Sequence, residues 1–202
     1  MSRFAIDFYI SYDIILKIEV FVGLIMIERP KVRSSKVVYD GWLNLRVDEL
    51  EVSGRHNPYP YDVVTIGNDG VAVLPFLDGE TVLLCKQYRH PVRDTILELI
   101  QGGIDKNENL YDAVQRELRE ETGLVGEIEY KNTMYPMPGT LDMRMHIFTA
   151  INIEKISEPE SNPLEEALLI TMPFKDILQE VIEGKHKDSV LVWAIMHHAL
   201  AR

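Results

Sequence analysis

Residues 101–124 read QGGIDKNENLYDAVQRELREETGL, and this stretch decides the fold. A pair of glycines precedes a segment whose pattern predicts a helix over Asn109–Thr122. Asn109 is a favourable N-cap, because its side chain can accept hydrogen bonds from the free N–H groups of the first turn. Gly123 suits the position that follows a helix, where a left-handed backbone conformation ends it.

The acidic residues of this helix lie on an unusual face. At about 100° per residue, Val114 and Leu118 mark the apolar face that should pack on a sheet. Glu117 and Glu121 lie on the same side, and Glu120 lies at its edge. Carboxylates that face inward repel one another and lose hydration, so they need a positively charged partner.

Two kinds of positive partner are open at this point. Arg116 and Arg119 could neutralise part of the cluster as a structural ion network. Divalent cations are the favoured answer, because hard carboxylate oxygens suit Mg²⁺ or Mn²⁺. The backbone at Gly102 can approach a metal or phosphate closely, and the carbonyl of Gln101 is available as a ligand.

The spacing of these residues resembles the Nudix signature, Gly-x5-Glu-x7-Arg-Glu-apolar-x-Glu-Glu-x-Gly-apolar, at every fixed position. The polar and glycine positions of the signature are filled by Gly102, Glu108, Arg116, Glu117, Glu120, Glu121 and Gly123. The resemblance implies an α/β (α+β) fold, namely a Nudix-type α/β/α sandwich with a mixed β-sheet. It also implies hydrolysis of a nucleoside diphosphate that is linked to another moiety.

The resemblance further implies a role for each residue of the signature. The expected metal ligands are Glu117, Glu120, Glu121 and the backbone carbonyl of Gln101. The expected structural residues of the signature are Gly102, Glu108, Arg116 and Gly123. Two or three Mg²⁺ ions per site are implied, with Mn²⁺ as a substitute.

Three runs outside the signature resemble the ADP-ribose pyrophosphatase branch of this family. They are QYRHP at 87–91, LELIQGG at 97–103 and YPMPG at 135–139. The branch implies Mg-dependent hydrolysis of the pyrophosphate of ADP-ribose to AMP and ribose 5-phosphate. Two alternatives stay open, which are hydrolysis of another nucleoside diphosphate sugar or dinucleotide and a non-catalytic module that senses ADP-ribose.

The branch also implies substrate contacts. The expected substrate-binding residues are Arg89, Glu98, Arg55, Gly102 and Pro138, and weaker candidates for the base pocket are Trp42 and Tyr61. The sequence departs from the branch at two points. Gln101 replaces a residue that is usually small, and Met143 follows Asp142 where an acidic pair is usual.

The general base is expected on a loop well after the signature. Glu165 is the first candidate and Glu166 the second, while Glu158 and Glu160 lie in the same acidic stretch. Glu120 is a further catalytic candidate through the metal. The alternative is that the four loop carboxylates only keep the loop solvated. Closure of such a loop over substrate would place the base and exclude water.

Composition limits the classes of partner. The 202 residues include 21 Lys and Arg against 32 Asp and Glu, a formal net charge of −11. Binding to a nucleic-acid backbone requires a basic face, so no nucleic-acid partner is expected. Cys85 is the single cysteine, which excludes an intrachain disulfide framework and a Cys-rich zinc site and favours a reduced, cytoplasmic setting.

The chain is expected to comprise three parts. Residues 1–27 form an N-terminal extension whose role is open: a packed extra element, an interfacial anchor, or a translated extension with Met26 as the natural start. Its longest uncharged run, Val20–Ile27, is too short to span a bilayer, so no membrane partner is expected. Residues 28–60 form an antiparallel β-strand lobe for dimerisation and the base pocket, and residues 61–202 form the hydrolase domain. The branch implies a homodimer.

The remaining elements are predicted from patterning. Strands are expected at 36–39, 43–50, 62–67, 71–76, 81–87, 96–100, 127–136, 144–152 and 167–172, and further helices at 173–184 and 188–201. Asp78-Gly79 predicts a tight hairpin between the strands at 71–76 and 81–87, because Gly accepts the positive φ that such a turn requires.

Overall fold

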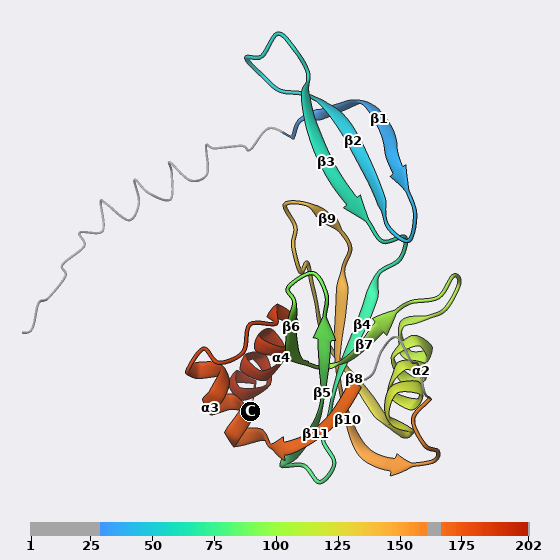
Figure 1. Ribbon diagram of the computed structural model, residues 1–202, viewed down its shortest axis with the longest axis vertical. Helices are drawn as coiled ribbons and strands as arrows, with labels where there is room; N and C mark the ends of the chain where they lie inside the picture. The colour runs from blue at the N-terminus through green and yellow to red at the C-terminus, as the bar shows by residue number, and fades with distance from the viewer. Residues whose placement is uncertain (1–28, 161–166, 202) are drawn as a thin grey trace, which may run out of the picture. The chain divides into compact units, whose positions relative to one another are not determined.

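The computed structural model describes residues 29–160 and 167–201 (Figure 1). The expected extension at 1–27 and the candidate bases Glu165 and Glu166 therefore lie outside the described residues. The chain divides into two compact units, which are treated separately below. Of the described residues, the smaller unit comprises 29–35 and Asp48–Tyr61, and the larger unit comprises Lys36–Val47, 62–160 and 167–201.

Three strands occupy the region in which the sequence predicts a β-strand lobe. They are β1 (Lys31–Asp40), β2 (Asn44–Glu51) and β3 (Tyr59–Thr65), which follow one another in a sheet of order β1-β2-β3-β9. Within the smaller unit, Ser34 donates a hydrogen bond to Glu49 at 2.9 Å and Ser35 donates one to Asp48 at 2.6 Å. The domain boundary at residue 60 stays a prediction.

The larger unit is built on a mixed sheet of order β7-β4-β10-β8. Its strands are β4 (Gly70–Pro75), β7 (Ile100–Gly103), β8 (Leu124–Met134) and β10 (Met145–Lys155). Strands β4 and β10 run parallel, whereas the pairs β4–β7 and β10–β8 are antiparallel. Strand β7 is an edge strand of this sheet, and the helix that follows it packs on one face of the sheet, against β7, β4 and β8.

A second sheet of the larger unit has the order β11-β5-β6. Its strands are β5 (Thr81–Arg89), β6 (Asp94–Glu98) and β11 (Ala167–Pro173). The short strand β9 (Leu141–Asp142) pairs in parallel with β3, with Val64 opposite Leu141.

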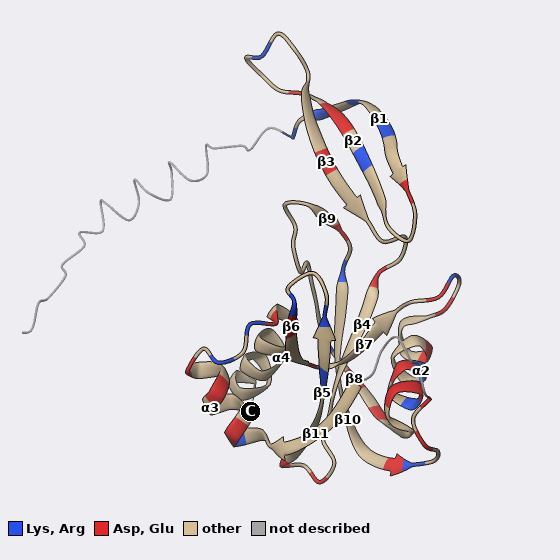
Figure 2. Ribbon diagram, in the orientation of Figure 1, with Lys and Arg blue, Asp and Glu red and all other residues tan. Residues whose placement is uncertain are grey.

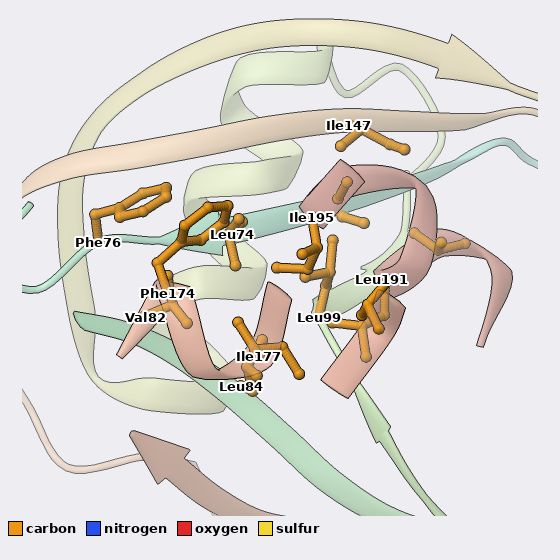
Figure 3. Close-up of a cluster of buried hydrophobic side chains, with 14 of the residues drawn as sticks. Leu74, Phe76, Val82, Leu84, Leu99, Ile147, Phe174, Ile177, Leu191 and Ile195 are labelled. Atoms are coloured by element: carbon orange, nitrogen blue, oxygen red, sulfur yellow. The ribbon is translucent and has the colours of Figure 1, made fainter. Parts of the chain in front are cut away.

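Helices cover both sides of these two sheets, as Figure 1 shows. Helix α2 (Leu110–Thr122) lies on one side, and α3 (Phe174–Ile182) and α4 (Ser189–Leu200) lie on the other. One buried cluster joins α2 to the mixed sheet through Val114, Leu118 and Phe148. The other joins α3 and α4 to both sheets (Figure 3). The predicted α/β/α sandwich with a mixed sheet is confirmed.

The hairpin prediction at Asp78-Gly79 is wrong in one respect. The turn forms, since Gly79 has a φ of 84° and Asp78 accepts hydrogen bonds from the N–H groups of Glu80 and Thr81 at 3.0 and 2.6 Å. The flanking strands, however, join different sheets and share only an isolated bridge between residues 76 and 82. Both edges of β5 are paired with β6 and β11, and this leaves no edge for β4.

Helix α2 has the two caps that the sequence predicts. Asn109 accepts hydrogen bonds from the N–H groups of residues 111 and 112, each at 3.0 Å. Gly123 has a φ of 74°, and its N–H donates to the carbonyl of Arg119 at 2.7 Å. Within the described residues, no helix is long and apolar enough to cross a bilayer.

The segment after β10 is fixed to the C-terminal end of α2. The N–H groups of Ile156 and Ser157 donate to the carbonyl of Gly123 at 2.9 and 3.2 Å, and that of Glu160 donates to the carbonyl of Glu120 at 2.7 Å. A Cβ at position 123 would overlap the carbonyl oxygen of Ser157. Gly123 is therefore required both for its positive φ and for this close approach.

We predict that Gly123→Ala destabilises the protein more than Gly184→Ala does. Both glycines have positive φ, 74° and 72°, so each alanine pays the left-handed penalty of about 1–2 kcal/mol. Only position 123 adds a clash with backbone, because nothing lies within 4 Å of a Cβ at 184. Urea unfolding measures both free energies, and equal losses would contradict this account of the α2 terminus.

Candidate active site

The inward face of α2 is organised by a single guanidinium group. Arg116 donates to both carboxylate oxygens of Glu108 at 2.9 Å, through Nε and Nη2. Its Nη1 donates to Glu117 at 2.7 Å and to Glu120 at 3.2 Å, and its Nη2 also donates to the carbonyl of Gly103 at 2.8 Å. Figure 2 shows the acidic and basic residues on this helix. The ion network that the sequence left open as an alternative is thus present around Arg116.

The charges of this network shift one another's pKa values. Burial raises the pKa of Glu117, against the opposing effect of Arg116, and the charges of Glu120 and Glu108 raise it further. Hydrogen bonding by Arg116 lowers the pKa of Glu108. Arg116 is in turn held more firmly in its charged form, chiefly by Glu108. Glu108 and Arg116 thus form the pair that the resemblance implies, although the structural role of that pair stays a prediction.

Glycine at position 102 makes room for one carboxylate of α2. A Cβ on Gly102 would overlap the carboxylate group of Glu117. Only 12% of the Glu117 side chain is exposed, and the backbone of β7 covers it. The backbone of Gly102 thus lies close to the inward carboxylate of α2, whereas its predicted approach to a metal or phosphate stays a prediction.

A second ion pair lies on the edge of the other sheet. Arg89 on β5 donates from Nε to both oxygens of Glu98 on β6 at 3.0 Å, and from Nη2 at 2.6 Å. Burial raises the pKa of the Cys85 thiol to about 12, and the charges of Glu121 and Glu98 contribute to that rise. Hydrogen bonding to Glu98 raises the pKa of Arg89, and the charge of Glu121 adds to that rise. The structure therefore joins the predicted substrate residues Arg89 and Glu98 in one ion pair between β5 and β6.

Other predicted site residues lie elsewhere or remain open. Arg55 belongs to the smaller unit, where its guanidinium lies over the ring of Tyr59 at 5.1 Å from the centroid, so its role in a base pocket stays a prediction. Pro138 is exposed on the loop between β8 and β9. Glu158 is exposed and pairs with Lys155 at 2.7 Å.

Two buried or partly buried carboxylates near this region were missed in the sequence. Asp188 caps α4 by accepting from the N–H of Leu191 at 2.7 Å, and burial raises its pKa, with the charge of Glu98 adding to the rise. Asp69 binds Arg144 through Nη2 at 2.7 Å, and its carbonyl accepts from the N–H of Ile104 at 3.0 Å. A capping signal was available for Asp188, but no local pattern joins positions 69 and 144.

The donor set of α2 suits a divalent cation in its chemistry. Glu117, Glu120 and Glu121 supply hard carboxylate oxygens, and the Gly102 backbone approaches the first of them. Across residues 29–160 and 167–201, three or more side chains that could hold a metal do not converge on one point. Two of the carboxylates bind Arg116 instead. A cation would therefore have to exchange with the Nη1 contacts of Arg116, and the ligand roles stay predictions.

Comparison with protein families and structures places this geometry in context. A family model described as the NUDIX domain matches residues 68–192. The ADP-ribose pyrophosphatase of Bacillus subtilis (strain 168) is 30% identical over 129 residues, which are 63% of this chain and 70% of that protein. The methanol dehydrogenase activator of Bacillus methanolicus is 25% identical over 174 residues, which are 85% of this chain and 93% of that protein.

One solved structure shares the fold. It is titled as an ADP compounds hydrolase and superposes with a TM-score of 0.76 at 20% sequence identity. The match covers 87% of this chain and 95% of the other chain. At this identity the likeness establishes the architecture alone.

We predict that Glu108→Gln lowers the free energy of unfolding at pH 7. We also predict that this free energy then decreases less steeply as the pH is lowered. The folded-state pKa of Glu108 lies below its ordinary value of 4.5, so the unfolded state binds more protons in that range. The stabilisation by this ion pair is therefore present above pH 4.5 and is lost as the pH falls through the lowered pKa. Denaturant unfolding between pH 3 and 7 measures the profile.

The matched control for this profile is Glu154→Gln, which removes an exposed carboxylate at the far end of β10. It should leave the profile of the unmodified protein unchanged. A Glu108→Gln profile that runs parallel to that of the unmodified protein would contradict the assigned pairing.

Proposed function

Because this chain belongs to the NUDIX family, we propose that it hydrolyses the pyrophosphate bond of ADP-ribose to give AMP and ribose 5-phosphate. The observation that carries the proposal is the presence of two sets of ion-paired side chains in the larger unit. One is the set of α2 carboxylates around Arg116, and the other is the Arg89–Glu98 pair. The pKa of Arg89 is raised by hydrogen bonding to Glu98 and, after that, by the charge of Glu121. The relative named ADP-ribose pyrophosphatase supports this choice of substrate.

The α2 carboxylates and the backbone carbonyl of Gln101 would hold Mg²⁺. When bound, the ion neutralises the diphosphate, polarises a P–O bond and lowers the pKa of a bound water. Arg116 keeps Glu117 oriented through its 2.7 Å contact and balances the charge of Glu108. That contact restrains the Glu117 carboxylate, so Arg116 preorganises this ligand before the cation binds.

Arg89 is suited to bind a phosphate of the substrate. Its guanidinium is fixed by the buried carboxylate of Glu98, and 36% of its side chain remains exposed. A planar guanidinium with free N–H groups recognises phosphate oxygens in a defined orientation. Water then attacks phosphorus and loses its proton to a carboxylate of the acidic loop, for which Glu165 and then Glu166 are proposed.

We further propose that the protein is a homodimer joined through the surface of β1. Within the larger unit, three side chains of β1 are about half exposed, namely Val37 at 54%, Val38 at 49% and Tyr39 at 57%. Trp42 follows them and is 83% exposed, which argues against a core role for it. Adjacent exposed apolar groups of this kind are typical of a contact surface between proteins. A second copy of the chain is the proposed occupant.

We predict that Val37→Asp converts the dimer to a monomer, because Val37 shares one face of β1 with Tyr39 and a charge on that face would be buried without a partner. The control is Ile182→Asp on α3, which places the same charge on another apolar side chain that is 62% exposed. Analytical ultracentrifugation measures both masses. A monomeric unmodified protein, or a dimeric Val37→Asp variant, would contradict the proposal.

We predict that Glu121→Gln lowers kcat/KM for ADP-ribose roughly a thousandfold, since metal-based charge stabilisation supplies several kcal/mol. Glu127→Gln, which changes an exposed carboxylate on β8, should keep full activity. Chromatography of products identifies AMP and ribose 5-phosphate among a panel of sugar diphosphates, dinucleotides and triphosphates. If another substrate is cleaved faster, that substrate replaces ADP-ribose in the proposal. If ADP-ribose binds but is not cleaved, the protein is a non-catalytic module that senses ADP-ribose.

A further inference from the structure

The side chain of Gln101 lies on the opposite face of β7 from the α2 carboxylates. Successive side chains of a strand point to opposite faces. Ile100 is buried in the cluster beneath α2, and Gly102 faces Glu117 of the same helix. Gln101 therefore points to the other face, beside its cross-strand neighbour Ala72 on β4.

The amide oxygen of Gln101 is buried without a hydrogen-bond partner in the described part of the chain. A buried acceptor left unpaired costs free energy, so native proteins pair nearly all such atoms. The residue as a whole is only partly buried, so its side chain still reaches accessible space. An unpaired acceptor at this position therefore points to a ligand that donates a hydrogen bond.

The surroundings of this amide are apolar. Gly70 lies on the same face of β4 as Ala72, and a Cβ there would lie 2.6 Å from Cε of Met143 and 3.0 Å from Cε of Met145. Methionine side chains are adaptable and offer no N–H or O–H donor. Met143 and Met145 therefore supply no hydrogen-bond donor to this face of β4.

We propose that Gln101 determines substrate specificity by accepting a hydrogen bond from a ribose hydroxyl of the substrate at its amide oxygen. The inference rests on the proposed function. The amide and the Glu117 carboxylate lie on opposite faces of β7, but β7 is the edge strand of its sheet, so a substrate with its diphosphate at Glu117 can extend its sugar around this edge toward the amide. An acceptor selects hydroxyl groups, because ionised phosphate oxygens have no hydrogen to donate.

The substitution that tests this is Gln101→Met, which keeps the side-chain length and removes the polar oxygen. Two opposite effects are expected. The melting temperature rises, because an unpaired buried acceptor has been replaced by an apolar group. The affinity for α,β-methylene-ADP-ribose in the presence of Mg²⁺ falls about tenfold by titration calorimetry, as expected for one hydrogen bond.

A matched control exists on α2. Gln115 also has a buried amide oxygen without a partner in the described residues. Gln115→Met should raise the melting temperature and leave the affinity unchanged. Methylenediphosphonate, which has a diphosphate but no hydroxyl, should bind Gln101→Met as tightly as it binds the unmodified protein. Gln101→Ala removes the same oxygen without adding bulk and should show the same loss of affinity.

Three results would overturn the inference. Unchanged affinity with a lower melting temperature would show that Gln101 binds a structural water. Equal weakening of the nucleotide analogue and methylenediphosphonate would show that it acts through the metal site. Failure of the unmodified protein to bind the ADP-ribose analogue would overturn the proposed function and this inference together. The titration of the unmodified protein shows this outcome before any variant is measured.

Discussion

The contact between Arg116 and three carboxylates is the interaction on which the site depends. One guanidinium joins Glu108, Glu117 and Glu120 at distances of 2.7–3.2 Å. Burial already disfavours the ionised form of Glu117, and the charges of Glu120 and Glu108 disfavour it further. The hydrogen bond and the positive charge of Arg116 oppose these two effects. A cation bound as proposed would have to displace this contact, because Arg116 occupies oxygens of Glu117 and Glu120.

The rest of the larger unit holds this helix in place from both ends. The caps at Asn109 and Gly123 fix its length, and the glycine also admits the backbone of the segment after β10. Gly102 lets β7 approach the helix closely enough to cover Glu117. The Arg89–Glu98 pair lies on a different sheet, between β5 and β6. The two sets of ion-paired side chains are thus held by separate elements of the larger unit.

The sequence predicted the features that are determined locally. The caps of α2, its inward carboxylates and the turn at Asp78-Gly79 each follow from neighbouring residues, and the structure contains all three. The separation of β4 and β5 into two sheets was not predictable in this way, because it depends on which distant strands take the edges of β5.

Contacts between distant segments were also beyond the reach of the sequence. Asp69 and Arg144 meet across 75 residues, and no spacing signals such a pair. The unpaired amide of Gln101 emerged only once the face of β7 was known, although the sequence marked the residue as unusual. Local patterns therefore predicted helix α2 and its caps, whereas the environment of the Gln101 side chain required the tertiary structure.

The central claim is that the α2 carboxylates exchange Arg116 for a divalent cation. Titration with Mn²⁺, followed by the electron paramagnetic resonance of the free ion, tests it directly. The account predicts saturable binding by the unmodified protein, a loss of that binding in Glu117→Gln, and full binding in the exposed control Glu129→Gln on β8. Equal Mn²⁺ binding by all three proteins would contradict the claim.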